Sequence, residues 1–448
     1  MEDTALIKVF RRLSQGSKQS VQSGKELDAF DKYMHVDRPI DKVVRDDMND
    51  IQQEGGGILF LVGSAGDGKS HMISTLNKEY PDFMFKNDAS ESPWPTVDSI
   101  DALKIFLADF KDATLQTTTS KMLVAINMGK LSAFIDDAEV QASFSEIVKC
   151  AKTLFDEDNL RHEETKRVRI VSFANHQIFE LFPEQKNTKY PVDSLFIKKV
   201  LEKITNKANN NEFRTAFNSS IPVGTDFDPC YVNYQLLSIP EIQDAIVKFI
   251  IEAIVRFKLM LTPRELFDFI YRIVVPDSYA TFNPSKDFFK SLLPSILFAG
   301  GENKILKCLA QLDPLKHGSI DHNDYLSELF TSIEIPKEEC FDNLKGKLHP
   351  RFFEILSEYY KNNRNNVEDI SKLLFRLKHL LDYHSESDEY TSFLGTLCGY
   401  YDNDEDRLFP LYETIQRSIP HFYGSYTNKP NVVPLDIQGR EYKMFVSC

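Results

Sequence analysis

The sequence predicts an α/β fold in which a mostly parallel, doubly wound sheet is followed by a largely α-helical C-terminal region. Residues 58–62 form an apolar run that leads directly into the glycine-rich stretch 63–70. Further apolar runs of strand length, at 122–126 and 168–173, alternate with segments of helical spacing. Strands that alternate with helices favour a parallel sheet covered on both faces, and ligands bind beyond the carboxyl ends of such strands.

The glycine-rich stretch reads Gly-Ser-Ala-Gly-Asp-Gly-Lys-Ser, which is the GxxxxGK[ST] pattern of a phosphate-binding loop between a strand and a helix. It predicts a P-loop NTPase. Glycines let consecutive N–H groups surround a phosphate, and the N-terminus of the following helix adds positive potential. Lys69 supplies a cation for the β- and γ-phosphates, and the Ser70 hydroxyl is a ligand for Mg²⁺. The residues predicted to bind nucleotide are Gly63, Ser64, Ala65, Gly66, Asp67, Gly68, Lys69, Ser70, His71 and Arg264.

Hydrolysis needs a second carboxylate to order the metal and a group to position the attacking water. No apolar run ends in Asp-Glu, so Asp88, after a short second strand at 83–85, is the best candidate, with Glu91 nearby. The alternative for Asp88 is an acidic turn that only caps the strand. Asp109 competes for the metal role, but its segment has helical spacing, which places it away from the carboxyl edge of the sheet.

Two further positions have polar side chains that suit a nucleotide. Asn127 follows the strand at 122–126, where its amide can bind a γ-phosphate or the attacking water; the alternative is a left-handed turn residue favoured by Gly129. Arg264 lies in the first turn of a helix that Thr262 and Glu265 begin with a capping box. The helix dipole disfavours a cation there, so Arg264 either meets an anion such as a phosphate or is a solvated, ion-paired side chain.

Two weaker signals remain. His71, directly after the loop, is expected to face the packing between helix and sheet. Arg376 fits either a trans-acting arginine or one residue of an amphipathic core helix. We find no motif of a nuclease or a metalloprotease.

The chain divides into five predicted regions. They are a helical lead-in (1–54), a P-loop NTPase core (55–204), a linker or excursion rich in Asn, Ser, Gly and Pro (205–238), a helical lid (239–280), and a mostly helical C-terminal domain with a short terminal hairpin (281–448).

Composition excludes several classes of protein. A net charge of −14 argues against a free-standing basic DNA-binding protein. The six cysteines show no CxxC spacing, which disfavours a zinc site or a disulfide framework. The N-terminus has no apolar signal segment, and the most apolar window, 245–261, has too many charges for a membrane span. A cytoplasmic protein without membrane contact is expected.

Several motifs taken together resemble one family. They are residues 60–71, 87–92, 123–131 and 261–266, together with the C-terminal Val433-Pro-Leu…Gly439…Phe445. The chain resembles the DNA phosphorothioation-dependent restriction proteins of the DptF type, and the match extends over most of its length.

The resemblance implies an AAA+-like ATPase subunit that uses ATP and Mg²⁺. Such a subunit acts with partner subunits in a bacterial complex that restricts DNA without phosphorothioate marks. The chain would contact DNA through the complex. Oligomerisation of the chain itself is also compatible with the resemblance. In such ATPases the strand-end Asn is called sensor 1 and the lid Arg sensor 2, which correspond to Asn127 and Arg264. The departure from the family pattern is the missing standard Walker B acid. Alternatives are a non-hydrolysing, nucleotide-gated scaffold and an unrelated regulatory ATPase of the AAA+ or STAND-like type.

Overall fold

The protein consists of two compact units, each described here by itself. Unit 1 contains Met1–Phe179 and Ser194–His384, and unit 2 contains Glu180–Asp193 and Ser385–Cys448. The computed structural model describes residues 3–19, 29–64, 66–87, 89, 96–155, 166–182, 190–220, 228–277, 279–316, 320–332, 334–335, 339–362, 364–383, 387–423, 432–435 and 444–447.

Unit 1 contains a four-stranded sheet in which every pair of neighbouring strands is parallel. The strands are β1 (Gly57–Val62), β2 (Met84–Lys86), β3 (Lys121–Ile126) and β4 (Val168–Ser172), in the order β2-β3-β1-β4. All six residues of β1 are buried because it lies between β3 and β4. The predicted α/β class with a parallel sheet is confirmed, and the loop that follows β1 leaves from the interior of the sheet.

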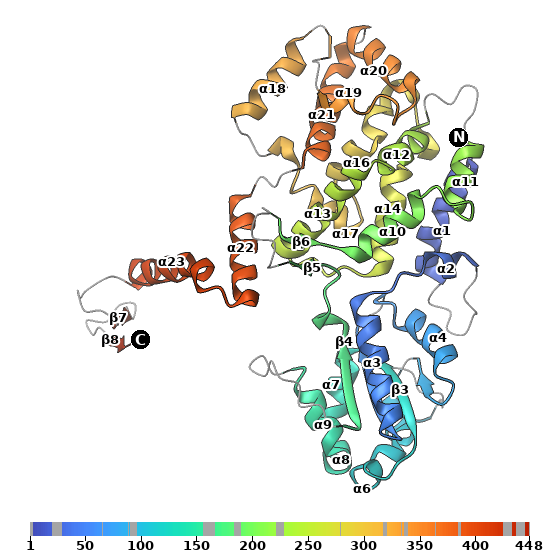
Figure 1. Cartoon of the computed structure of the whole chain (residues 1–448), viewed down its shortest axis with the longest axis vertical. Helices are drawn as coiled ribbons and strands as arrows, with labels where there is room; N and C mark the ends of the chain where they lie inside the picture. The colour runs from blue at the N-terminus through green and yellow to red at the C-terminus, as the bar shows by residue number, and fades with distance from the viewer. Residues whose placement is uncertain are drawn as a thin grey trace. The chain divides into compact units, whose positions relative to one another are not determined.

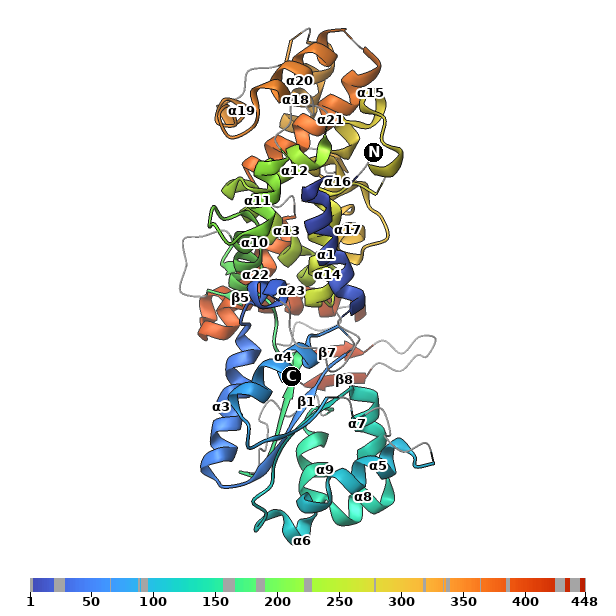
Figure 2. The same cartoon turned by 90° about the vertical axis from the view of Figure 1, so that its right-hand side faces the viewer.

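Helices cover both faces of this sheet (Figures 1 and 2). Side chains alternate along a strand, so Leu59 and Leu61 pack with α3 (Pro39–Gln53) and α4 (Lys69–Glu79), whereas Phe60 faces the opposite helices. Those helices are α5 (Ser99–Phe106), α6 (Asp112–Leu115), α7 (Met128–Ile135), α8 (Ala138–Ser143) and α9 (Ser145–Lys152).

The N-terminal helices divide between the sheet and the helical part of unit 1. The ring of Phe10 in α1 (Ala5–Gln19) lies 4.9 Å from that of Phe213 and 6.1 Å from that of Tyr234, so α1 belongs to the helical core. In contrast, α3 packs on the sheet. The short α2 (Ala29–Met34) and the linker of residues 35–38 connect the two parts.

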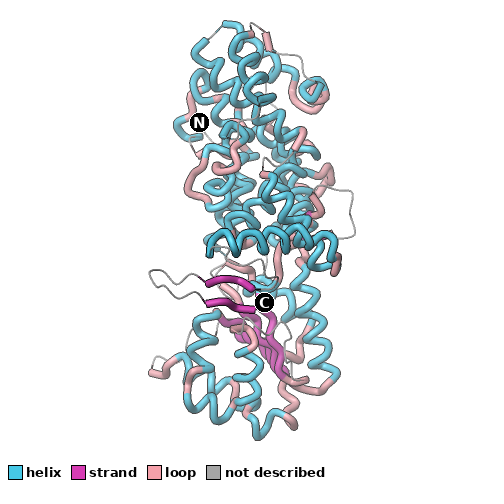
Figure 3. The backbone as a smooth tube through the Cα atoms, turned by 90° about the vertical axis from the view of Figure 1, so that its left-hand side faces the viewer, coloured by secondary structure: helices cyan, strands magenta, loops and turns pink. Residues whose placement is uncertain are grey.

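Helices make up most of unit 1 outside the region of the sheet (Figure 3). They include segments whose composition predicts a linker. Residues 205–238 include α11 (Glu212–Ser219) and α12 (Pro229–Leu237), and both bury aromatic or aliphatic side chains. The other helices are α10 (Leu195–Thr205), α13 (Pro240–Phe257), α14 (Pro263–Val274), α15 (Pro284–Asp287), α16 (Leu293–Ala299), α17 (Lys304–Leu309), α18 (Ile320–Thr331), α19 (Glu339–Asp342), α20 (Pro350–Asn362) and α21 (Arg364–Leu381).

The start of α14 matches its sequence signal. The Thr262 hydroxyl accepts the Glu265 N–H at 3.2 Å, and the Glu265 carboxylate accepts the Thr262 N–H at 3.1 Å. The predicted capping box is confirmed, and the helix ends at Val274, ahead of Pro276 as expected.

Unit 2 contains two helices and two short antiparallel strand pairs. The helices are α22 (Asp388–Asp402) and α23 (Glu405–Tyr423); β5 (Glu180–Leu181) pairs with β6 (Val192–Asp193), and β7 (Val432–Leu435) with β8 (Met444–Ser447). No helix in the described part of either unit combines the length and apolar character that a membrane span requires.

Candidate functional site

The glycine-rich loop leaves β1 at the carboxyl end of the sheet and enters α4 at Lys69. Gly66 and Gly68 have φ angles of +95° and +88°, a region that residues with a side chain rarely adopt. Gly63 is needed for another reason: a Cβ there would lie 2.6 Å from the Asp67 carboxylate and 2.8 Å from the Phe173 ring. Gly66 and Gly68 are therefore required by their backbone angles, and Gly63 by the close approach of Asp67 and Phe173. Ala65 lies outside the described residues.

Lys69 turns back over the loop. Its ammonium group donates to the carbonyl oxygens of Gly63 at 2.7 Å and Ser64 at 2.6 Å. The cation is thus held above the loop rather than extended into solvent. Ser70 follows in the first turn of α4, where the helix N-terminus and its unpaired N–H groups favour anions.

Asp67 stabilises the loop from within. Its carboxylate accepts the Ser64 N–H at 2.5 Å, which closes the turn. Burial raises the pKa of the Asp67 carboxyl above its ordinary value, and the charge of Glu265 adds to the rise. The Ser64 hydrogen bond and the cations Lys69 and Arg38 oppose that rise.

The first turn of α14 lies against this loop. The Thr262 hydroxyl oxygen would be 3.4 Å from a Cβ placed on Gly66, and Glu265 is close enough to act on the Asp67 pKa. Arg264 lies in the same turn and is partly buried. The structure therefore places the helix turn that contains Arg264 beside the predicted phosphate loop, as an anion-binding role for Arg264 requires.

Asn127 also lies at this edge of the sheet, because the neighbouring Ile126 carbonyl accepts the Gly63 N–H at 3.1 Å. Its side chain caps α7, with Oδ1 accepting the Lys130 N–H at 2.7 Å. The alternative of a left-handed turn residue was wrong, since φ is −87° and ψ 156°. One acceptor position of the amide therefore serves the helix, and the water-positioning role of Asn127 stays a prediction.

Asp88 and Glu91 both lie outside the described residues. The preceding residue, Asn87, has a buried Oδ1 without a hydrogen-bond partner. Asp109 is in a 3-10 turn and accepts the Ser120 hydroxyl just before β3, at the amino end of the sheet. The expectation that Asp109 lies away from the carboxyl edge is confirmed.

No group of three or more His, Cys, Asp and Glu side chains in the described residues is arranged to hold a metal ion. Mg²⁺ in nucleotide sites needs no such cluster, because phosphate oxygens and waters supply most of its ligands. The Ser70 hydroxyl at the start of α4 fits one protein ligand of that kind.

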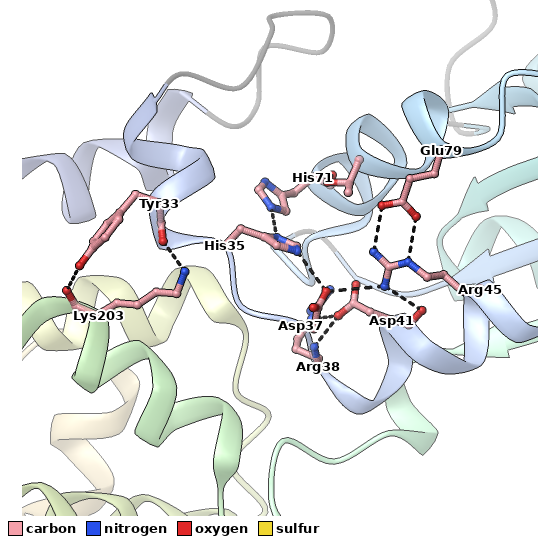
Figure 4. Close-up of polar contacts among 10 residues, drawn as sticks. Tyr33, His35, Asp37, Arg38, Asp41, Arg45, His71, Glu79 and Lys203 are labelled. Atoms are coloured by element: carbon pink, nitrogen blue, oxygen red, sulfur yellow. Dashed lines mark hydrogen bonds and ion pairs between the residues drawn. The ribbon is translucent and has the colours of Figure 1, made fainter. Parts of the chain in front are cut away.

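His71 was expected to face the helix–sheet packing, and this expectation was wrong. Met72, Ile73 and Leu76 form the buried face of α4, which turns His71 towards the linker between α2 and α3. There its Nε2 lies 2.7 Å from Nδ1 of His35, with the two rings stacked at 4.9 Å (Figure 4). One imidazole must donate and the other accept, so the pair requires at least one neutral ring.

This pair predicts an acid-sensitive fold. Burial first, and then the charges of His35 and Arg38, lower the pKa of His71 from its ordinary 6.5 to about 4, against a smaller opposite effect of Asp41. Asp37 faces the other nitrogen of His35 at 3.2 Å. Between these two pKa values the unfolded chain binds a proton that the folded protein does not. Stability is therefore complete above about pH 6.5 and falls on acidification, by about 2 kcal/mol near pH 5.

Urea unfolding near pH 7.5 and pH 5 measures this loss. We expect His71→Gln, which cannot titrate, to lose about 2 kcal/mol less than the unsubstituted protein over the same interval. Equal pH dependence of the two proteins would contradict the assignment.

The structure adds residues to the loop that sequence reasoning missed. Arg38, from the linker before α3, donates from Nη1 to the Asp67 carbonyl oxygen at 2.6 Å. Phe173, directly after β4, covers Gly63 and lies 5.0 Å beneath the Arg38 guanidinium. Both are distant from the loop in sequence and belong to no local motif, so no pattern in the chain indicates them.

Arg376 is not available as a trans-acting arginine. It forms a two-point ion pair with Asp313, at 2.6 and 3.1 Å, and both side chains are largely buried. The interpretation as a residue of a core helix is the one that fits.

A comparison with known proteins found no matching family, no similar characterised protein and no similar solved structure. Glycines with positive φ, a lysine above the loop, a helix N-terminus and the first turn of α14 converge at the carboxyl edge of a parallel sheet. That arrangement can bind a polyphosphate.

Proposed function

We propose that this chain is a P-loop NTPase that binds ATP with Mg²⁺ at residues 63–70 and hydrolyses it. The observation that carries the proposal is the loop itself. Gly66 and Gly68 adopt left-handed angles between β1 and α4, and Lys69 lies over the loop at its entry to the helix. Each of these features is what phosphate binding by backbone N–H groups requires.

Several of the predicted site residues have a defined part in this proposal. The N–H groups of the loop and the N-terminus of α4 hold the phosphates, and Lys69 turns its charge from the loop carbonyls to the β- and γ-oxygens. The Ser70 hydroxyl would hold Mg²⁺, which would supply positive charge beside the phosphates. Arg264 approaches them from α14. Asp88 with Glu91 orders the metal and the attacking water, which the second amide position of Asn127 orients.

We further propose that the ATPase works as a subunit of a bacterial complex that restricts DNA lacking phosphorothioate marks. The resemblance to proteins of the DptF type supports this assignment, together with an acidic chain that does not suit direct DNA binding. Partner subunits in the cytoplasm would contact the DNA and read the nucleotide state of this chain.

A second candidate is a nucleotide-gated scaffold that binds ATP without turning it over. The observation that favours it is the capping role of Asn127, which commits one acceptor position of the amide to Lys130. Phosphate release measured with and without DNA and partner subunits separates the two. Turnover under any of these conditions supports the ATPase, whereas tight ATP binding with zero turnover throughout supports the scaffold.

Transformation with a plasmid lacking phosphorothioate marks tests the restriction role. Cells with the complete complex should reject it, and cells in which this chain contains Lys69→Ala should accept it. Undiminished restriction by the Lys69→Ala complex would contradict the proposal.

A further inference from the structure

Arg38 is a cation beside the phosphate loop, yet it belongs neither to the loop nor to the helix that follows. It directly precedes α3, which packs on the same face of the sheet as α4. Its side chain is only 10% exposed, and that of its partner Asp41 is 5% exposed. The Asp41 carboxylate accepts both the backbone N–H of Arg38, at 2.7 Å, and its Nε, at 3.3 Å. These two bonds determine the direction in which the guanidinium points.

The remaining edge of the guanidinium faces the loop (Figure 4 shows Arg38 in the linker and Asp41 in the first turn of α3). Nη1 donates to the Asp67 carbonyl oxygen at 2.6 Å, and Nη2 would lie 3.4 Å from a Cβ on Gly68. The Phe173 ring lies on one side of the group, 5.0 Å from its central carbon. Desolvating an ion pair is costly, and geometric specificity is one recognised use of such a pair.

The peptide bond shows what this contact achieves. The Asp67 carbonyl and the Gly68 N–H belong to one planar trans peptide, so they point in opposite directions. A carbonyl held on Arg38 therefore turns the Gly68 N–H away from Arg38. Gly68 has no side chain to restrict its φ angle of +88°, so the bond to Arg38 limits the rotation of this peptide.

We propose that Arg38 is a positioning residue of the nucleotide site, which orients the Asp67–Gly68 peptide so that the Gly68 N–H faces a bound β-phosphate. The inference depends on the proposed nucleotide binding and adds to it a residue outside the loop. Because the β-phosphate is common to ADP and ATP, the loss of Arg38 lowers the affinity for both nucleotides by the same factor.

Arg45 provides a matched control. It is also an arginine of the α3 region, and it pairs with Glu79 at the far end of α4, at 2.9 and 3.3 Å, without touching the loop. Arg38→Ala removes a contact between the start of α3 and the loop, and Arg45→Ala removes a contact between α3 and the end of α4. If the role of Arg38 is merely structural, both variants should melt at a lower temperature, and both should bind nucleotide with unchanged affinity.

The test is the equilibrium affinity of the full chain for ATP and ADP with Mg²⁺, together with the melting temperature. We expect Arg38→Ala to lower the affinity for both nucleotides about tenfold. Arg45→Ala should change these affinities by less than about twofold. Arg38→Lys keeps the charge but not the fork of donors, so we expect an intermediate loss.

Unchanged affinity in Arg38→Ala would overturn the proposal, as would a larger loss for ATP than for ADP, which indicates direct contact with the γ-phosphate. If Arg38→Ala does not fold, Arg38→Lys decides, and full affinity in that variant overturns the proposal. Failure of the unsubstituted protein to bind either nucleotide would instead refute the proposed function itself.

Discussion

Replacing Lys69 by Ala should weaken ATP binding by about 100-fold or more. The ammonium group is the one side-chain cation of the loop, and a charge-assisted bond to phosphate inside a partly enclosed site contributes about 3 kcal/mol. The fold should persist, because the bonds of Lys69 to the carbonyl oxygens of Gly63 and Ser64 lie within the loop itself and join no two helices or strands of the core. Titration of a fluorescent ATP analogue measures the change.

Lys78→Ala is the matched control for this substitution. Lys78 is an exposed residue in the last turn of α4, at the opposite end from the phosphate loop. The Lys78→Ala variant should bind ATP with the same affinity as the unsubstituted protein. Equal affinities of the Lys69 and Lys78 variants would show that the loop does not bind phosphate through its lysine.

Asn233→Leu should destabilise the protein by about 3–5 kcal/mol, the largest loss of stability that we expect from one polar side chain. Asn233 is completely buried in α12. Its amide nitrogen donates to the carbonyl oxygens of Val274 and Ser291, at 3.1 and 2.9 Å, and its Oδ1 accepts the Leu293 N–H at 2.6 Å. Leucine has a similar size but leaves all three backbone groups buried and unpaired.

Urea unfolding monitored by circular dichroism measures the loss. Asn210→Leu, an exposed position in the same region of sequence, should change stability by less than about 0.5 kcal/mol. A comparable stability of the two variants would contradict the bridging role of Asn233.

Asn233 also explains which parts of the fold sequence reasoning missed. The Asn-rich composition of 205–238 is typical of loops, but composition does not distinguish an exposed Asn from a buried one. Asn211, likewise fully buried, caps α11 through the N–H groups of Phe213 and Arg214. Asn233, in contrast, joins segments that are 41 to 60 residues away in sequence, and no local pattern records those partners.

Features whose signal lies within a few residues were predictable. The strand, loop and helix around Gly63–Ser70 appear in consecutive residues, and so does the capping box of α14, which begins beside the loop. The contact of Arg38 with Asp67 joins positions 29 residues apart, and Phe173 meets the loop only through strand pairing. The sequence therefore predicts the parts of the site that are formed by consecutive residues. It does not indicate Arg38 and Phe173, which reach the loop only through tertiary packing.

The most direct test of nucleotide binding at this loop is a crystal structure with a non-hydrolysable ATP analogue and Mg²⁺. We expect the β-phosphate within hydrogen-bonding distance of the N–H groups of residues 66–70, with Lys69 moved from the Gly63 and Ser64 carbonyls onto the phosphates. Arg264 should approach the γ-phosphate. Lys69 still bonded to those carbonyls, with no nucleotide at the loop at saturating concentration, would contradict the account.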